Sequence, residues 1–258
     1  MARFEELVSE AAAAPIDGWD FSWLQGRATE QRPSWGYVRL IGARIEAARA
    51  VLDVQTGGAE VFGEALERAR RPPEVIRATE SWPPNLALAT QRLARFGGSV
   101  EPAPEAGPLP FAEELFDLVV SRHPVVTPWA EIARVLQPGG TFLSQQVGAG
   151  TNRELTDFLM GPQPISAARS TGRAVAEAEA AGLSVVDLRQ ETLRAEFFDI
   201  GAVVYFLRLV PWTVPDFAVD AYPEQLRRLH ERIQVQGPFL TSVERFLIEA
   251  RKPPVPPQ

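Results

Sequence analysis

The chain has 258 residues, enough for one large domain or a domain with insertions, and a hydrophobic content of 45% typical of globular proteins. A net charge of -7 argues against a broad nucleic-acid-binding face, and zero cysteines with two histidines exclude disulfides, thiolate metal sites and histidine-rich metal clusters, so no metal is expected. The N-terminus lacks a secretory signal and no apolar run is long enough to cross a membrane, which predicts a cytoplasmic protein.

Residues 1–40 precede the first predicted strand and are rich in aromatic side chains, including Trp19, Trp23 and Trp35. These side chains either fix an N-terminal helix to the core or form a lid over a ligand, because aromatic faces attract cations and stack on planar molecules. The residues of such a lid that we would test are Arg27, Arg32 and Trp35.

The segment from Ala50 to Val61 organises the rest of the chain. It begins as an apolar run that ends at Asp53, and it continues through Gly57-Gly58 into an amphipathic helix. The pattern predicts a buried strand, a tight turn and a helix, whose free N-terminal amides favour a negatively charged or polar ligand. This is the first unit of a nucleotide-binding α/β domain.

A second predicted strand runs from Val75 to Glu80 and ends in an acid. A carboxylate at this place can accept hydrogen bonds from both hydroxyls of a ribose. Trp82 follows directly, where its ring either covers one face of an adenine or packs into the core. The segment therefore adds a nucleoside-binding acid to the glycine turn.

Further along, Phe116 to Ser121 reads as a buried strand, and Glu131 to Phe142 reads as a helix, a turn and another strand. Pro138 ends that helix, and Gly139-Gly140 permits the left-handed turn into the strand.

Together these segments resemble, in order, the motifs of class I S-adenosylmethionine (SAM) dependent methyltransferases. The matching stretches are Asp53-Val54-Gln55-Thr56-Gly57-Gly58-Ala59, Glu105-Ala106-Gly107-Pro108-Leu109-Pro110-Phe111, Phe116-Asp117-Leu118-Val119 and Arg134-Val135-Leu136-Gln137-Pro138-Gly139-Gly140-Thr141-Phe142. In the first of them, Gln55 and Ala59 stand where the family has its first and third glycine.

The resemblance implies a Rossmann-like, seven-stranded mixed sheet in an α/β fold, with a helical lid before it and a cap inserted before the last strand. The expected parts are a lid (1–40), a SAM-binding core (41–191), a cap (192–238), a final strand (239–252) and a disordered tail (253–258).

The resemblance also implies roles for individual residues. Asp53 is expected to orient the methionine end of SAM, Glu80 to hold the ribose and Glu105 to face the adenine. The full set expected to bind the cofactor is Asp53, Gln55, Thr56, Gly57, Gly58, Glu60, Thr79, Glu80, Trp82, Glu105, Ser121 and Arg122.

The acceptor is expected at the exit of the fourth strand, because ligands of open α/β sheets lie at the carboxyl ends of strands. There His123 is the candidate base, with a structural role in the loop as the alternative. The long, aromatic-rich insertion is expected to cap the acceptor, since loops of that length usually have a function. The residues expected to contact the acceptor are Trp35, Gln145, Gln146, Phe197, Asp199 and Tyr205.

The sequence therefore predicts a SAM-dependent methyltransferase, monomeric or homodimeric, that transfers a methyl group to a small molecule by in-line displacement. One alternative is an RNA or protein methyltransferase. Another is a non-catalytic binding module of the same fold, in which Gln55 and Ala59 close the cofactor cleft. A nicotinamide dehydrogenase is disfavoured because the turn lacks the spaced Gly-x-Gly-x-x-Gly.

Overall fold

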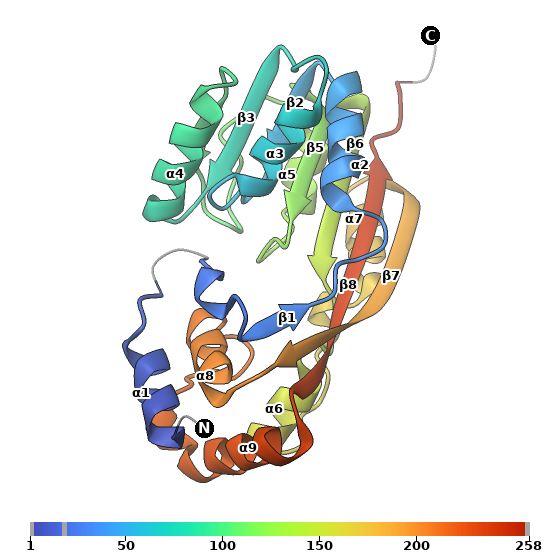
Figure 1. Ribbon diagram of the computed structural model, residues 1–258. Coiled ribbons are helices and arrows are strands. Elements are labelled where there is room, and N and C mark those ends of the chain that lie inside the picture. The colour runs from blue at the N-terminus through green and yellow to red at the C-terminus, as the bar shows by residue number, and fades with distance from the viewer. Residues whose placement is uncertain (1–2, 17–19, 256–258) are drawn as a thin grey trace. The chain divides into compact units, whose positions relative to one another are not determined.

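A computed structural model describes residues 3–16 and 20–255 of the chain, which divides into two compact units. Unit 1 consists of Met1–Arg32, Ala149–Ser166 and Thr192–Glu244. Unit 2 consists of Pro33–Gly148, Ala167–Glu191 and Arg245–Gln258. Figure 1 labels most of the helices and strands of both units.

A mixed sheet forms the centre of unit 2. Its parallel strands are β2 (Ala50–Asp53), β3 (Val75–Glu80), β4 (Ser99–Pro102), β5 (Phe116–Arg122) and β6 (Leu136–Val147). Two longer strands, β7 (Ser184–Phe197) and β8 (Phe239–Arg251), run through both units, and β8 is antiparallel to β6. Together with β1 (Ala28–Glu30) they give the strand order β1-β7-β8-β6-β5-β2-β3-β4.

Helices cover both faces of the sheet of unit 2. The helices are α2 (Tyr37–Ala47), α3 (Glu60–Arg68), α4 (Pro83–Ala94), α5 (Trp129–Val135) and α7 (Thr171–Ala180), with the short helix η2 (Ala167–Arg169). One apolar cluster joins α2, α3 and α4 to one set of strand side chains, including Val51 and Val120. A second cluster joins α5 and α7 to the alternate set, including Leu52 and Val119. Burial on both faces explains why these short strands are almost continuously apolar.

Unit 1 is built around one apolar helix, α8 (Ile200–Leu209), in which eight of ten residues are buried. Around it lie α1 (Phe4–Ala13), η1 (Ser22–Leu24), α6 (Arg153–Met160), η3 (Val219–Ala221) and α9 (Pro223–Gln236), which share its apolar cluster. α1 ends against Arg208 of α8, whose guanidinium donates to the carbonyls of Ala11 and Ala14.

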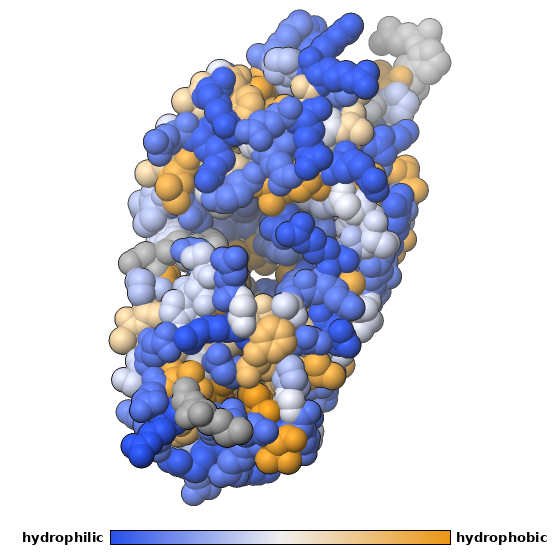
Figure 2. Space-filling view, in the orientation of Figure 1, coloured by the Kyte–Doolittle hydropathy of each residue, from blue (hydrophilic) through white to orange (hydrophobic). Residues whose placement is uncertain are grey.

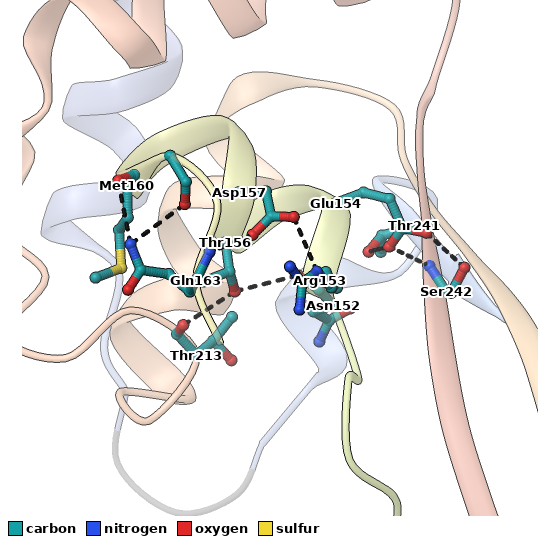
Figure 3. A network of polar contacts seen from close by, with 11 residues as sticks. Asn152, Arg153, Glu154, Thr156, Asp157, Met160, Gln163, Thr213, Thr241 and Ser242 are labelled. Atoms are coloured by element: carbon teal, nitrogen blue, oxygen red, sulfur yellow. Dashed lines mark hydrogen bonds and ion pairs between the residues drawn. The ribbon is translucent and has the colours of Figure 1, made fainter. Parts of the chain in front are cut away.

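Polar contacts fix α6 within unit 1 (Figure 3). The Glu154 carboxylate accepts from the Thr241 hydroxyl at 2.8 Å and from the Ser242 amide and hydroxyl at 2.9 and 2.6 Å. The Thr156 hydroxyl donates to the Thr213 carbonyl at 3.2 Å. These contacts join α6 to β8 and to the segment after α8. Polar side chains therefore stabilise this part of unit 1 in addition to its apolar core.

The α/β fold with a mixed, Rossmann-like sheet is confirmed, but the expected number of seven strands is wrong: the described part of the chain contains eight. The additional strand, β1, is three residues long and pairs Ala28 with Phe197. Such a short, mostly exposed strand has no apolar alternation that a sequence could reveal, and its pairing is with the distant strand β7. β7 itself continues to Phe197, past the expected start of the cap at residue 192.

The two units also group segments that the expected boundaries separate. Residues 149–166, placed in the core by the sequence, belong to unit 1, and residues 33–40, placed in the lid, belong to unit 2. Residues 1–2 and 17–19 of the expected lid and 256–258 of the expected tail lie outside the described residues. In both units, the face seen in Figure 2 is mainly hydrophilic, with hydrophobic residues scattered across it. Across residues 3–16 and 20–255, no helix combines the length and apolarity needed to cross a bilayer.

Candidate functional site

The first polar group of the site is Asp53, the last residue of β2, which is 6% exposed. Its Oδ2 accepts from the Thr56 hydroxyl at 2.6 Å. Burial raises the pKa of Asp53 from 3.8 to about 7, and the Glu80 carboxylate adds to the rise, whereas Thr56 and Arg122 oppose it. Asp53 is thus a buried carboxyl that is poised between its protonated and ionised forms near neutral pH.

The turn after Asp53 has the backbone of a glycine-rich loop although two of its residues are not glycine. Gln55, Gly57 and Ala59 have φ values of 59°, 63° and 59°, all in the left-handed region. The cost is about 1–2 kcal/mol for each non-glycine residue in this conformation. The loop therefore keeps its turn geometry, and α3 begins directly after it, at Glu60.

The side chain of Gln55 stabilises this turn in a way that the sequence did not predict. Its Oε1 accepts from the Val125 amide at 2.7 Å, and its Nε2 donates to the Val126 carbonyl at 2.7 Å. A glycine cannot make these bonds, which join the turn after β2 to the loop after β5. They offset part of the cost of the left-handed backbone at this residue.

Glu80, at the end of β3, faces the same turn and is 7% exposed. Its Oε2 accepts from the Gly57 amide at 2.7 Å, and its Oε1 accepts from the amides of Ser81 and Trp82, each at 2.9 Å. Because a carboxylate oxygen has about two lone-pair sites, Oε2 can accept one further hydrogen bond. Thr79 extends the contact, since its Oγ1 accepts from the Gln55 amide at 3.2 Å.

The remaining residues expected around the cofactor surround this turn more loosely. Trp82 is half-buried and directly precedes α4. A carboxylate oxygen of Glu105 lies 3.4 Å from the Ser81 hydroxyl, and the Glu105 carbonyl lies 3.4 Å from Nε2 of Gln55. Glu60 is exposed, and its carboxylate forms an ion pair at 2.8 Å with Arg92 of α4. A Cβ added at Gly57 would meet nothing within 4 Å, whereas one at Gly58 would collide with the Glu60 carboxylate.

The end of β5 supplies the next group of residues. The Ser121 side chain is buried and donates to the Val54 carbonyl at 2.8 Å. The Ser121 carbonyl accepts from the Tyr37 hydroxyl at 2.8 Å. Burial, with Asp53 as the next contribution, raises the pKa of Tyr37 well above 10, so its hydroxyl stays a donor. Tyr37 was not among the expected residues; its place just after Trp35-Gly36 was the only signal for it.

His123 follows β5 with a φ of 56°, and its amide donates to the Gln145 carbonyl at 2.7 Å. Its Nε2 lies 2.9 Å from Nε2 of Gln145, whose Oε1 accepts from the indole N–H of Trp35 at 2.8 Å. The adjacent Gln146 donates instead to the Thr127 hydroxyl at 3.1 Å. Trp35, Gln145 and His123, all predicted on the acceptor side, are therefore joined by a chain of hydrogen bonds.

The pKa of His123 lies well below 6.5, first because the ring is desolvated and then because Arg122, Arg245 and Arg169 lie around it. The imidazole is consequently neutral at pH 7. Arg245 on β8 and Arg169 in η2 were not expected at the site, and nothing in their local sequence distinguishes them from surface arginines.

The three residues expected in the cap have structural contacts within unit 1. Phe197 is 3% exposed and packs edge-on against Phe206, and the Asp199 side chain accepts from the Ala202 amide at 2.8 Å as the N-cap of α8. The buried Tyr205 hydroxyl donates to the Asp20 carbonyl at 2.9 Å. Of the expected lid residues, Arg27 lies over the ring of Trp23 at 4.1 Å and pairs with Glu10 at 2.8 Å, whereas Arg32 is exposed.

Comparison with protein families adds to this geometry, because residues 52–144 match the family described as the methyltransferase domain. The match begins within β2 and ends within β6, so it includes the turn after Asp53, Glu80 and the exit of β5. The matched residues lie within unit 2.

Solved structures resemble most of the chain in fold. A provisionally assigned methyltransferase from Bacillus halodurans is 20% identical with a TM-score of 0.60, covering 85% of this chain and 99% of its own. The YcgJ protein from Bacillus subtilis is 17% identical with a TM-score of 0.58, covering 84% and 98%. A phosphoethanolamine N-methyltransferase from Haemonchus contortus, bound to phosphomonomethylethanolamine and S-adenosylhomocysteine, is 15% identical with a TM-score of 0.54, covering 98% and 61%. Comparison with curated proteins found no match.

Proposed function

We propose that this chain is a SAM-dependent methyltransferase that acts on a small-molecule acceptor. The observation that carries the proposal is Glu80, whose Oε2 lies 2.7 Å from the Gly57 amide and keeps one acceptor site. An acid that links the end of β3 to the turn after β2 is placed where a nucleoside binds in an open α/β sheet.

Two features of the turn fit the cofactor. There is open space beside Gly57, where the backbone could approach a ligand closely. Gln55 and Ala59 already have the left-handed backbone that the glycines of the motif would supply, so they do not close the loop. In the proposal, Glu80 holds the ribose, Asp53 and Thr56 lie toward the methionine end, and Trp82 with Glu105 lies toward the adenine.

When bound, SAM would supply an electrophilic sulfonium methyl group, which the acceptor would take in line as the sulfur–methyl bond breaks and S-adenosylhomocysteine leaves. The contribution of this chain is to hold the acceptor at the exit of β5 in the correct orientation, and orientation can account for a large part of such a rate enhancement. In the proposal, Trp35, Gln145 and Gln146 contact the acceptor. The net charge of -7 favours a small molecule over nucleic acid as the acceptor.

The test is isothermal titration with S-adenosylhomocysteine, comparing the wild type with Glu80→Ala. We expect saturable binding that falls tenfold or more in the variant, because losing a charged hydrogen-bond partner costs about 1.5–3 kcal/mol. Glu46→Ala, which changes an exposed acid on α2, is the matched control and should bind as the wild type does.

Glu80→Ala also leaves three backbone amides without their acceptor, so thermal unfolding must be recorded for each protein. A folded wild type that binds neither SAM nor S-adenosylhomocysteine would contradict the proposal. Binding of RNA that weakens steeply with salt would instead favour a nucleic-acid acceptor.

A further inference from the structure

The chain of hydrogen bonds from Trp35 to His123 has a defined direction. An indole N–H can only donate, so the Gln145 atom that lies 2.8 Å from it must be the carbonyl oxygen. The amide nitrogen of Gln145 then faces Nε2 of His123 at 2.9 Å, and an amide nitrogen can also only donate. Nε2 of His123 is therefore the acceptor, and the proton of the neutral ring is on Nδ1.

The surroundings prevent this direction from reversing. Turning the Gln145 amide over would set its NH2 group against the indole N–H of Trp35, so two donors would face each other. Gln145 and Trp35 are only 3% and 5% exposed, so water has little access to relieve that contact. A proton on Nε2 would likewise oppose the amide donor of Gln145.

The positive charges around His123 also favour the neutral ring. Arg122 comes from the end of β5, Arg245 from β8 and Arg169 from η2, and each of these guanidiniums disfavours an imidazolium. The hydrogen bonds of His123 among the described residues both involve Gln145, so no carboxylate of this part of the chain is hydrogen-bonded to the ring. The same three positive charges favour an anionic oxygen next to the ring.

We propose that His123 donates a hydrogen bond from Nδ1 to an anionic oxygen of the methyl acceptor and does not remove a proton from it. Gln145 and Trp35 are the positioning residues that fix this tautomer. The inference rests on the proposed function and adds a substrate class, an acceptor with a carboxylate or phosphate group. His123 would then not generate the nucleophile, so the methylated atom would need a lone pair without deprotonation by this residue.

The tautomer can be measured without any enzymatic activity, by nitrogen-15 correlation spectra of the imidazole rings. The sequence has two histidines, and His230→Gln assigns their signals. We expect His123 to have its proton on Nδ1 and no imidazolium signal at pH 6. A ring with its proton on Nε2, or one that titrates near 6.5, would overturn the proposal.

Two matched glutamine variants test the positioning residues. In Gln145→Glu a carboxylate faces Nε2, so a proton should move to Nε2 or the ring should become charged. Gln146→Glu adds the same charge one residue away, where the side chain contacts Thr127, and should leave the tautomer of His123 unchanged. An unchanged tautomer in Gln145→Glu would show that Gln145 does not position the ring.

The donor role is tested with acetate and inorganic phosphate as probes, in the presence of S-adenosylhomocysteine, with choline as the cationic control. At least one anion should shift the Nδ1–H signal saturably, and choline should not. His123→Ala should weaken binding of that anion about tenfold, as expected for a lost charge-assisted hydrogen bond. His123→Asn, which tolerates the left-handed backbone and keeps an N–H donor, should retain more of it.

If neither anion binds, the donor role is refuted. If S-adenosylhomocysteine does not bind but the tautomer is found, the proposed function fails and the tautomer assignment remains, so the two failures are distinguishable.

Discussion

Replacing Asp53 by asparagine should stabilise the protein, and the gain should depend on pH. The pKa of Asp53 in the folded chain is about 7, raised by burial from 3.8. Between these two values the folded state holds a proton that the unfolded state has lost. The free energy of unfolding therefore falls as pH rises through this range. The stability that the folded chain gains from the proton on Asp53 is fully present below pH ~4 and is lost above pH ~7.

The size of the effect follows from the same two pKa values. A rise of about three pH units corresponds to about 4 kcal/mol, at ~1.4 kcal/mol for each unit. An asparagine side chain has no proton to lose, and its oxygen can still accept from the Thr56 hydroxyl that lies 2.6 Å from Oδ2 of Asp53. Asp53→Asn should thus match the wild type near pH 4 and exceed its stability by a few kcal/mol at pH 8.

Urea unfolding at several pH values between 4 and 8 measures this difference, with hydrogen exchange of the β2 amides reporting on unit 2 specifically. Asp220→Asn, which changes an exposed carboxyl, is the control and should show no such dependence. A stability difference between Asp53→Asn and the wild type that is constant across this range would refute the assignment of a raised pKa to Asp53.

Three further substitutions test other contacts. Gln55→Ala should be less stable than Gln55→Gly by about 1 kcal/mol in thermal unfolding, because only glycine relieves the left-handed backbone, and both should loosen the loop after β5 in hydrogen exchange. Asp199→Ala should cost about 1 kcal/mol through loss of the N-cap of α8, and Asp199→Asn should restore most of it; an asparagine variant as unstable as the alanine one would contradict a capping role. Glu154→Gln should destabilise unit 1 by about 1–3 kcal/mol, relative to the exposed control Glu224→Gln, because fewer acceptors remain for its three donors. Burial raises the pKa of Glu154, but hydrogen bonds from Ser242 outweigh it and leave the pKa lowered, so this contribution should be present near neutral pH and be lost as acid protonates the carboxylate; an equal loss at all pH values would argue against it.

Local chemistry along the chain was enough to predict one part of the fold. The apolar runs at β2 and β5, the Thr56-Gly57-Gly58 turn and the Pro138-Gly139-Gly140 segment each favour one local conformation, and their order along the chain predicted the α/β sheet. Glu80 could be singled out as well, because a carboxylate at the end of an apolar strand can accept hydrogen bonds from both hydroxyls of a ribose. The left-handed backbone at Gln55 also follows from its position in the turn.

The other features of the site and the cap depend on partners far apart in the chain, and they emerged from the tertiary structure alone. Trp35, Gln145 and His123 are ordinary residues when taken separately, and only their contact across 110 and 22 residues fixes the proton on one ring nitrogen. The aromatic residues of the cap could equally have lined a pocket, but Phe197 and Tyr205 fill the core of unit 1 together with α8, in which eight of ten residues are buried. Burial and hydrogen-bond direction are properties of the packed chain, because both depend on which distant groups exclude water from a side chain, and no local pattern records them.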